Sequence, residues 1–291
     1  MQQTKEILKQ VKKLEITTKQ LVDGLITGNY HSVFKGQGIE FSEIRDYRPG
    51  DDVRAIDWKV TARLNHPYIK EFIEERDLQV YFVIDMSGSG SFGSNISKKQ
   101  KGLELAASLM FAALRNNDKV GAFLFTDKIE KFIPARKGRK HILKVLSTLV
   151  GFLPKSSKTD LTNILAQISK IVKRRSILFI ISDFYDRNEF FKPLKILRNR
   201  HDVIALSIKD VREKEIPNVG LIELEDEETG EQILVNTSDE KFRNSYVKLI
   251  QDKESQLYSN LKRLKIDSVN ILTSDQYEIP LRKFFKKRHH R

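Results

Sequence analysis

Residues 78–93 read LQVYFVIDMSGSGSFG. The apolar run at its start has the length and the β-branched and aromatic content of a buried strand. The run ends on Asp85, and two hydroxyls follow at alternating positions, Ser87 and Ser89. One strand therefore delivers a carboxylate and two hydroxyls to the sheet edge where open α/β proteins bind ligands. Oxygen donors from a short loop suit a hard divalent cation such as Mg²⁺ better than zinc or copper.

Strand-like and helix-like segments alternate downstream of this stretch. Besides 78–84, we expect strands at 120–126, 129–134, 176–182, 202–208, 220–226, 231–236 and 268–273. We expect helices at 98–116, 139–150, 161–173, 188–199 and 238–264. Two neighbouring strand pairs, 120–126 with 129–134 and 220–226 with 231–236, are predicted to form hairpins. The alternation predicts an α/β fold of three layers, with a mostly parallel, doubly wound sheet.

The N-terminal part has a different pattern. Residues 4–27 carry apolar side chains at helical spacing, which predicts one or two amphipathic helices. The following stretch is irregular, with turns at KGQG (35–38) and RPGDD (48–52). We therefore divide the chain into an N-terminal region with a helical and irregular extension (1–77), the α/β domain (78–273) and a basic tail (274–291).

Residues 35–76 interleave arginines with aspartates and glutamates. This pattern favours an internal ion-pair network that fixes the segment to the sheet, with Trp58, the only tryptophan, as its apolar anchor. The alternative is a docking surface for a partner.

Composition excludes several classes of protein. The 291 residues contain no cysteine, so there is no disulfide, thiolate metal site or cysteine nucleophile. No apolar run approaches ~20 residues, and the charged N-terminus lacks the apolar core of a signal peptide. We therefore expect a cytoplasmic protein. The net charge of +13 indicates an anionic partner without selecting among nucleic acid, anionic lipid and an acidic protein face.

Two further loops are predicted to meet the first. Thr159 precedes the helix expected at 161–173, and Asp183 ends the strand expected at 176–182. If both come from the carboxyl edge of the sheet, two carboxylates and three hydroxyls converge there, a set that suits an octahedral cation. The alternative for each residue alone is a helix cap or a turn, since caps and turns also favour Asp, Ser and Thr.

Other chemistries for the same loop are less well supported. Residues 88–93 match G-x-G-x-x-G after a strand, but no acidic residue ends a next strand at the spacing of the dinucleotide fingerprint. A P-loop is excluded because G-K-[ST] is absent. An aspartate-nucleophile phosphatase would use Asp85, but the position two residues on is Ser87 instead of a second acid.

The loop, Thr159 and Asp183 resemble the metal-ion-dependent adhesion site (MIDAS) of a von Willebrand factor A (vWA) domain, over about residues 78–273. The upstream motifs resemble the DUF58 family more specifically. They are KGQGIEF (35–41), RDYRPGDD (45–52), RAIDW (54–58) and ER (75–76). Members of this family, whose molecular role is uncharacterised, are commonly encoded beside MoxR-type AAA+ ATPases and other vWA proteins.

The resemblance implies a metal site of Asp85, Ser87, Ser89, Thr159 and Asp183, holding Mg²⁺ or alternatively Mn²⁺ or Ca²⁺. It also implies that a partner's acidic residue completes the coordination. Gly90 departs from the family's usual Met after the second serine, which makes the loop more flexible but removes no ligand. Asp160 follows Thr159 as in the family, and we expect it to cap the next helix.

We therefore predict a non-enzymatic protein-interaction module, an adaptor for a MoxR-type AAA+ ATPase in assembly or activation of other proteins. The histidines show no motif spacing. The alternatives are a metal-dependent phosphohydrolase or a basic protein that binds nucleic acid or an anionic membrane.

Nucleic acid is disfavoured because aromatic residues do not interleave with the basic ones. The tail LRKFFKKRHHR (281–291) reads as a frayed end or as a peripheral contact with the inner face of the membrane, where Phe284 and Phe285 can insert.

Overall fold

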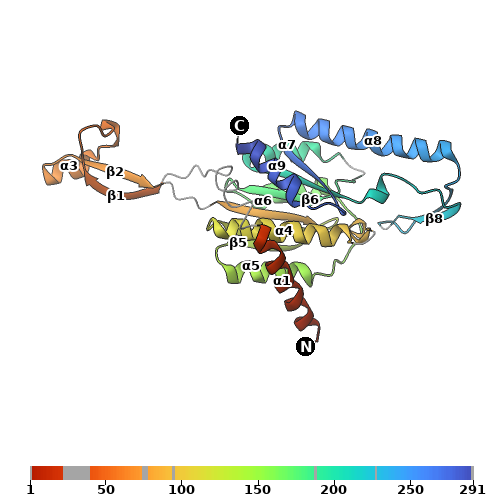
Figure 1. Ribbon diagram of the computed structural model, residues 1–291. Coiled ribbons are helices and arrows are strands. Elements are labelled where there is room, and N and C mark those ends of the chain that lie inside the picture. The colour runs from red at the N-terminus through yellow and green to blue at the C-terminus, as the bar shows by residue number, and fades with distance from the viewer. Residues whose placement is uncertain are drawn as a thin grey trace. The chain divides into compact units, whose positions relative to one another are not determined.

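The computed structural model describes residues 2–21, 40–73, 78–93, 96–186, 189–226 and 228–289 (Figure 1). The chain divides into two units, one of residues 1–33 with 79–291 and one of residues 34–78. Helix α1 (Gln2–Leu21) belongs to the larger unit, although the sequence grouped it with an N-terminal region.

The larger unit is built on a mostly parallel sheet. Its strands are β3 (Gln79–Asp85), β4 (Lys119–Phe125), β5 (Ile129–Arg136), β6 (Ile177–Ser182), β7 (Asp202–Lys209) and β10 (Asp267–Leu272). Among the described residues the sheet has six strands, in the order β10-β7-β6-β3-β4-β5. Strand β3 pairs in parallel with both β4 and β6, and β7 extends the parallel run to β10. Strand β5 pairs antiparallel with β4, as the predicted hairpin requires.

This strand order is that of a doubly wound sheet. Numbered along the chain, the strands lie in the order 3-2-1-4-5-6, so the direction of winding reverses between β3 and β6. The predicted α/β fold with a mostly parallel sheet is confirmed. Strand β6 is buried at every position, as expected for a parallel strand covered on both faces.

Helices cover both faces of the sheet (Figure 1). They are α4 (Lys98–Arg115), α5 (Arg139–Val150), α6 (Leu161–Ile171), α7 (Phe191–Arg200), α8 (Glu240–Arg263) and α9 (Glu278–His289). Side chains of α6, α7 and α8 share one apolar cluster with β3, β4, β6 and β7. Helix α4 packs on the other face, where the stacked rings of Phe82 and Phe179 lie 5.4 Å apart. Helix α1 packs against α4 and α5.

The predicted second hairpin is also present. Strands β8 (Leu221–Glu225) and β9 (Gln232–Asn236) pair antiparallel with each other, as a two-stranded sheet separate from the main one. Three of its apolar side chains are largely exposed, namely Leu221, Ile233 and Leu234. The hairpin therefore buries little apolar surface.

The basic C-terminal segment folds as part of the larger unit. Leu281 and Phe285 of α9 are fully buried, and Arg288 pairs with Asp202 and Asp267. The expectation of a frayed tail is therefore wrong, and so is insertion of Phe285 into a membrane surface. The buried side chains of α9 lie four residues apart, on one face of the helix. The basic residues occupy the remaining positions, so the charge of the segment does not prevent it from packing on the core. No described helix is long and apolar enough to span a bilayer.

The smaller unit has more regular structure than the sequence predicts. Strands β1 (Glu40–Asp46) and β2 (Tyr68–Ile73) pair antiparallel, and the short helices η2 (Val53–Ala55) and α3 (Trp58–Leu64) connect them. Trp58 is 68% exposed, so it is not buried within its own unit, and its role as an anchor to the main sheet stays a prediction. It begins a helix of seven residues in which no side chain is buried.

The predicted turn at RPGDD is present. Gly50 adopts φ +104°, a conformation that favours glycine, and the Asp51 N–H donates to the Arg48 carbonyl. The Asp51 carboxylate accepts from Arg45 at 2.8 Å, and this hydrogen bond lowers the pKa of Asp51 to about 2. The predicted KGQG turn lies outside the described residues.

Candidate functional site

The switch in winding direction places two carboxylates side by side. Strand β3 ends on Asp85, and β6 ends on Ser182, immediately before Asp183. These strands are neighbours, but β3 leads to α4 on one face of the sheet and β6 leads to α7 on the other. Such a reversal opens a crevice outside the carboxyl ends of the strands, where doubly wound proteins bind ligands.

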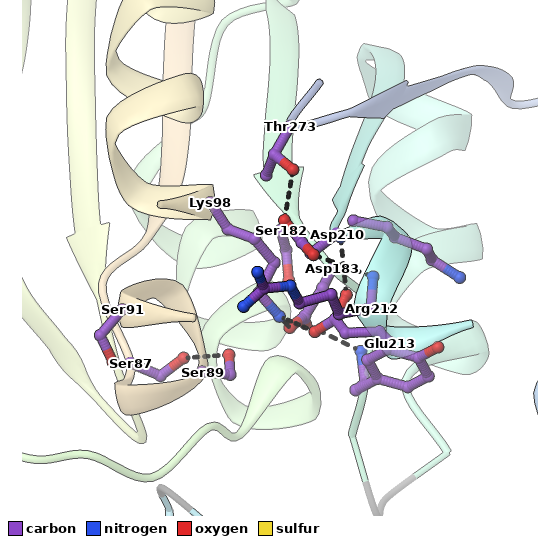
Figure 2. Close-up of polar contacts among 12 residues, drawn as sticks. Ser87, Ser89, Ser91, Lys98, Ser182, Asp183, Asp210, Arg212, Glu213 and Thr273 are labelled. Carbon is purple, nitrogen blue, oxygen red and sulfur yellow. Dashed lines mark hydrogen bonds and ion pairs between the residues drawn. The ribbon is translucent and has the colours of Figure 1, made fainter. Parts of the chain in front are cut away.

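The loop after β3 is held by the carboxylate that begins it. Asp85 Oδ1 accepts from the Ser87 N–H at 3.0 Å, and Asp85 Oδ2 accepts from the Ser182 hydroxyl at 2.7 Å. The 3-10 turn η3 (Gly88–Ser91) follows, and the Ser87 and Ser89 hydroxyl oxygens lie 3.2 Å apart (Figure 2). The two predicted hydroxyls therefore come together.

Asp183 is the second carboxylate of the predicted set. Its Oδ1 accepts from the Tyr185 N–H at 3.1 Å, and its Oδ2 accepts from Lys98 Nζ at 2.6 Å. Lys98 also donates to Glu213 at 2.5 Å, as Figure 2 shows. Phe184 adopts φ +58°, an uncommon conformation for a residue other than glycine that often marks a functional site.

A small cavity separates the two carboxylates. Its volume is about 30 Å³, enough for one water molecule or one cation of similar size. Its polar lining comes from Asp85, Ser89, Lys98, Lys99, Ser182 and Asp183, and glycines and isoleucines complete it. Three of the five predicted ligands, Asp85, Ser89 and Asp183, therefore line a space of the size that a bound ion needs.

Thr159 reaches the same edge but has a different partner. Its loop contacts the serine loop through the Gly88 N–H, which donates to the Ser157 carbonyl at 2.8 Å. The Thr159 hydroxyl donates to Glu228 Oε1 at 2.7 Å. Asp160 accepts from the Asn163 N–H at 2.9 Å and caps α6, as expected.

The site carries an excess of negative charge. Burial and the nearby charge of Asp183 together raise the pKa of Asp85 to about 6, although the hydrogen bonds from Ser87 and Ser182 oppose this shift. Burial also raises the pKa of Glu213 and of Glu228, and Asp183 adds to both effects. Three carboxylates thus lie close to Asp183, and the Lys98 ammonium neutralises part of the negative charge.

These residues fit a hard divalent cation. Every donor among the five predicted residues is an oxygen, which suits Mg²⁺, Mn²⁺ or Ca²⁺. Within the described part of the chain, no three His, Cys, Asp or Glu side chains form a metal-binding group. A cation here therefore needs the hydroxyls of Ser87, Ser89 and Thr159 in addition to the two aspartates. The assignment of these five residues as ligands stays a prediction.

Sequence reasoning missed Lys98, Glu213 and Glu228. Lys98 opens a helix and reads as a solvated N-terminal residue, yet its side chain is 6% exposed. Glu213 has a local signal, because it forms a capping box with Asp210 in the short helix η4 (Val211–Glu213). Glu228 lies in a turn, and no sequence pattern around it indicates a contact with Thr159, which is 69 residues away in the chain.

The model of the family described as "Protein of unknown function DUF58" matches residues 43–256 of the chain. The chain belongs to this family. An uncharacterized protein of Mycobacterium bovis is 35% identical over 223 residues, which are 76% of this chain and 70% of the relative. The uncharacterized protein YeaD of Bacillus subtilis is 31% identical over 109 residues, which are 37% of this DUF58 chain and 25% of YeaD.

Two solved structures are similar to this DUF58 protein at low scores. The conserved hypothetical protein BatB from Bacteroides thetaiotaomicron has a TM-score of 0.46 and 15% identity, over 74% of this chain and 100% of BatB. The SpRpn10 VWA domain has a TM-score of 0.33 and 16% identity, over 46% of this chain and 76% of that domain.

Proposed function

We propose that this DUF58 protein is a non-enzymatic, divalent-metal-dependent protein-interaction module. We further propose that it serves as an adaptor for a MoxR-type AAA+ ATPase in assembly or activation of other proteins. The observation that carries the first proposal is the cavity between Asp85, Ser89 and Asp183 at the winding switch of the sheet. The adaptor role rests on the family resemblance.

Each residue has a distinct part in this proposal. Asp85 and Asp183 supply negative charge, and the hydroxyls of Ser87, Ser89 and Thr159 supply neutral oxygen donors. A bound divalent cation supplies the positive charge to which an acidic residue of a partner coordinates. The partner's carboxylate is then buried with a counter-charge, which avoids the cost of an unpaired buried ion.

The positions of two buried or partly buried histidines support binding over turnover. His141 Nε2 lies 2.9 Å from the Val120 carbonyl, near the start of β4, and His201 immediately precedes β7. Both imidazoles therefore lie at the amino edge of the parallel strands, opposite the carboxyl edge that holds Asp85 and Asp183.

The test combines metal binding with partner capture. Titration calorimetry with Mg²⁺ compares wild type, Asp85→Ala and Ser91→Ala, a matched control because Ser91 is a hydroxyl of the same loop outside the predicted set. The same three proteins then serve as baits in native extract, in Mg²⁺ and in EDTA. We expect Mg²⁺ binding, and Mg²⁺-dependent capture of a partner, by wild type and Ser91→Ala alone.

Three results count against the proposal or a part of it. Equal capture by all baits in both buffers contradicts metal-bridged recognition. A partner set without an AAA+ ATPase contradicts the adaptor role while leaving the metal-dependent module standing. Hydrolysis of p-nitrophenyl phosphate by wild type, lost in Asp85→Ala, would favour the phosphohydrolase instead.

A further inference from the structure

The turn between β8 and β9 reaches the proposed metal site from within the chain. Glu228 Oε1 accepts from the Thr159 hydroxyl at 2.7 Å, and the Glu228 carbonyl accepts from the Ser157 hydroxyl at 3.1 Å. The turn is therefore fixed at two points to the loop that carries a predicted metal ligand.

The turn also holds Glu228 in place by its own hydrogen bonds. Asp226 Oδ1 accepts from the Glu228 N–H at 2.8 Å, and the Asp226 carbonyl accepts from the Gly230 N–H at 2.7 Å. Gly230 adopts φ +73°, which closes the turn at low cost for glycine. The turn is thus closed by its own hydrogen bonds, and the Glu228 carboxylate that it carries contacts Thr159.

The position of the Glu228 carboxylate is unusual because another negatively charged group lies near it. Glu228 lies close enough to Asp183 for the two carboxylates to repel each other, and one hydroxyl donor compensates that repulsion in part. The arrangement would be favourable with a cation between the acids. A threonine hydroxyl can serve both neighbours, because its hydrogen is donated to Glu228 while its lone pairs remain for a cation.

We propose that Glu228 is a built-in ligand of the site, occupying the position that a partner's carboxylate takes. This inference rests on the proposed function. The chain then masks its own metal, and a partner binds by displacing the β8–β9 turn. Displacement would leave the main sheet intact, because the hairpin forms a separate two-stranded sheet in which Leu221, Ile233 and Leu234 are largely exposed.

The test counts the water molecules on bound Mn²⁺ by water-proton relaxation, with Mn²⁺ in place of Mg²⁺. It compares wild type with Glu228→Ala and with Glu231→Ala, which removes an exposed acid of the same turn. We expect Glu228→Ala to gain one exchangeable water and to bind Mn²⁺ at least roughly tenfold more weakly. Acetate, the simplest carboxylate, should then displace that water at concentrations that leave wild type and Glu231→Ala unchanged.

Asp85→Ala separates failure of this inference from failure of the proposed function. If wild type binds Mn²⁺, Asp85→Ala does not, and Glu228→Ala matches Glu231→Ala in water count and acetate response, the built-in ligand is overturned and the metal site stands. If wild type binds no Mn²⁺, both proposals are overturned.

Discussion

At the residue scale, the Lys98 ammonium balances part of the negative charge of the site when no cation is bound. Burial lowers the pKa of Lys98, but the charges of Asp183 and Glu213 outweigh that effect and raise it overall. The ammonium therefore stays charged between two acids. Removing one partner of such a buried pair leaves an uncompensated charge, which costs about 3–5 kcal/mol.

We predict that Lys98→Met lowers the thermal midpoint in EDTA and that Mg²⁺ recovers part of the loss. The gain from Mg²⁺ should exceed that of wild type, because Asp183 and Glu213 are then free to face a cation. Lys140→Met is the control, since Lys140 is an exposed lysine of α5 that does not line the cavity. A thermal scan with and without Mg²⁺ measures the effect. An Mg²⁺ shift equal to that of wild type contradicts it.

His201 predicts a dependence of stability on pH. It is 2% exposed, neither ring nitrogen has a hydrogen-bond partner in the described structure, and burial lowers its pKa to about 4. The unfolded chain therefore binds a proton near pH 6.5 that the folded chain takes up only near pH 4. The His201 contribution to the free energy of unfolding is constant above about pH 6.5 and falls as pH drops toward 4.

Urea titrations at several pH values measure this effect. We expect His201→Phe to flatten the decline between about pH 6.5 and pH 4. His66→Phe, a change at an exposed histidine of the smaller unit, should leave the decline as in wild type. The same slope in all three proteins would show that His201 does not contribute.

At the element scale, strands were predictable because their apolar runs are short, continuous and bounded by polar residues. Most expected strands match the structure to within one or two residues, and the hairpins are confirmed. Asp85 and Asp183 were predictable as neighbours because each follows such a run at the same sheet edge. Lys98 was not, because its acidic partners lie 85 and 115 residues further along the chain.

Helix α9 shows where composition misleads. Six basic residues suggested a solvated tail, whereas two apolar positions four residues apart, Leu281 and Phe285, fix the helix to the core. Trp58 is the converse within the smaller unit, a large apolar residue that a short helix leaves exposed there. The local sequence pattern of α9 does not show which of its residues contact the core, because those contacts are made with distant parts of the chain.

We predict that Phe285→Ala lowers the free energy of unfolding by about 3–5 kcal/mol, the range for truncating a buried aromatic side chain. Phe284→Ala should cost clearly less, because Phe284 is half-buried. Urea unfolding followed by circular dichroism measures both. Equal losses would contradict the packing of α9 described above.

At the scale of the whole molecule, stability should be uneven. Strands β3, β4, β6 and β7 are almost fully buried, whereas β8 and β9 expose most of their side chains. Local opening costs little free energy where few apolar contacts hold an element.

Hydrogen exchange on the full chain tests this expectation. We predict that amides of β3 and β6 exchange through global unfolding, and that those of β8–β9 and β1–β2 exchange at lower free energies. Uniform protection across these strands would show that the two-stranded sheets are held as firmly as the main one.

The ammonium of Lys98 has a consequence for the life of the protein in a cell. Many metal sites unfold when the metal is withdrawn, and the unfolded chain is then open to proteolysis. Here the Lys98 side chain already supplies positive charge to Asp183 and Glu213. If the proposed magnesium site exists, we therefore expect the surrounding loops to stay ordered when magnesium is scarce. Low magnesium would then reduce the number of protein molecules that are bound to a partner, but it would not reduce the number of folded protein molecules in the cell.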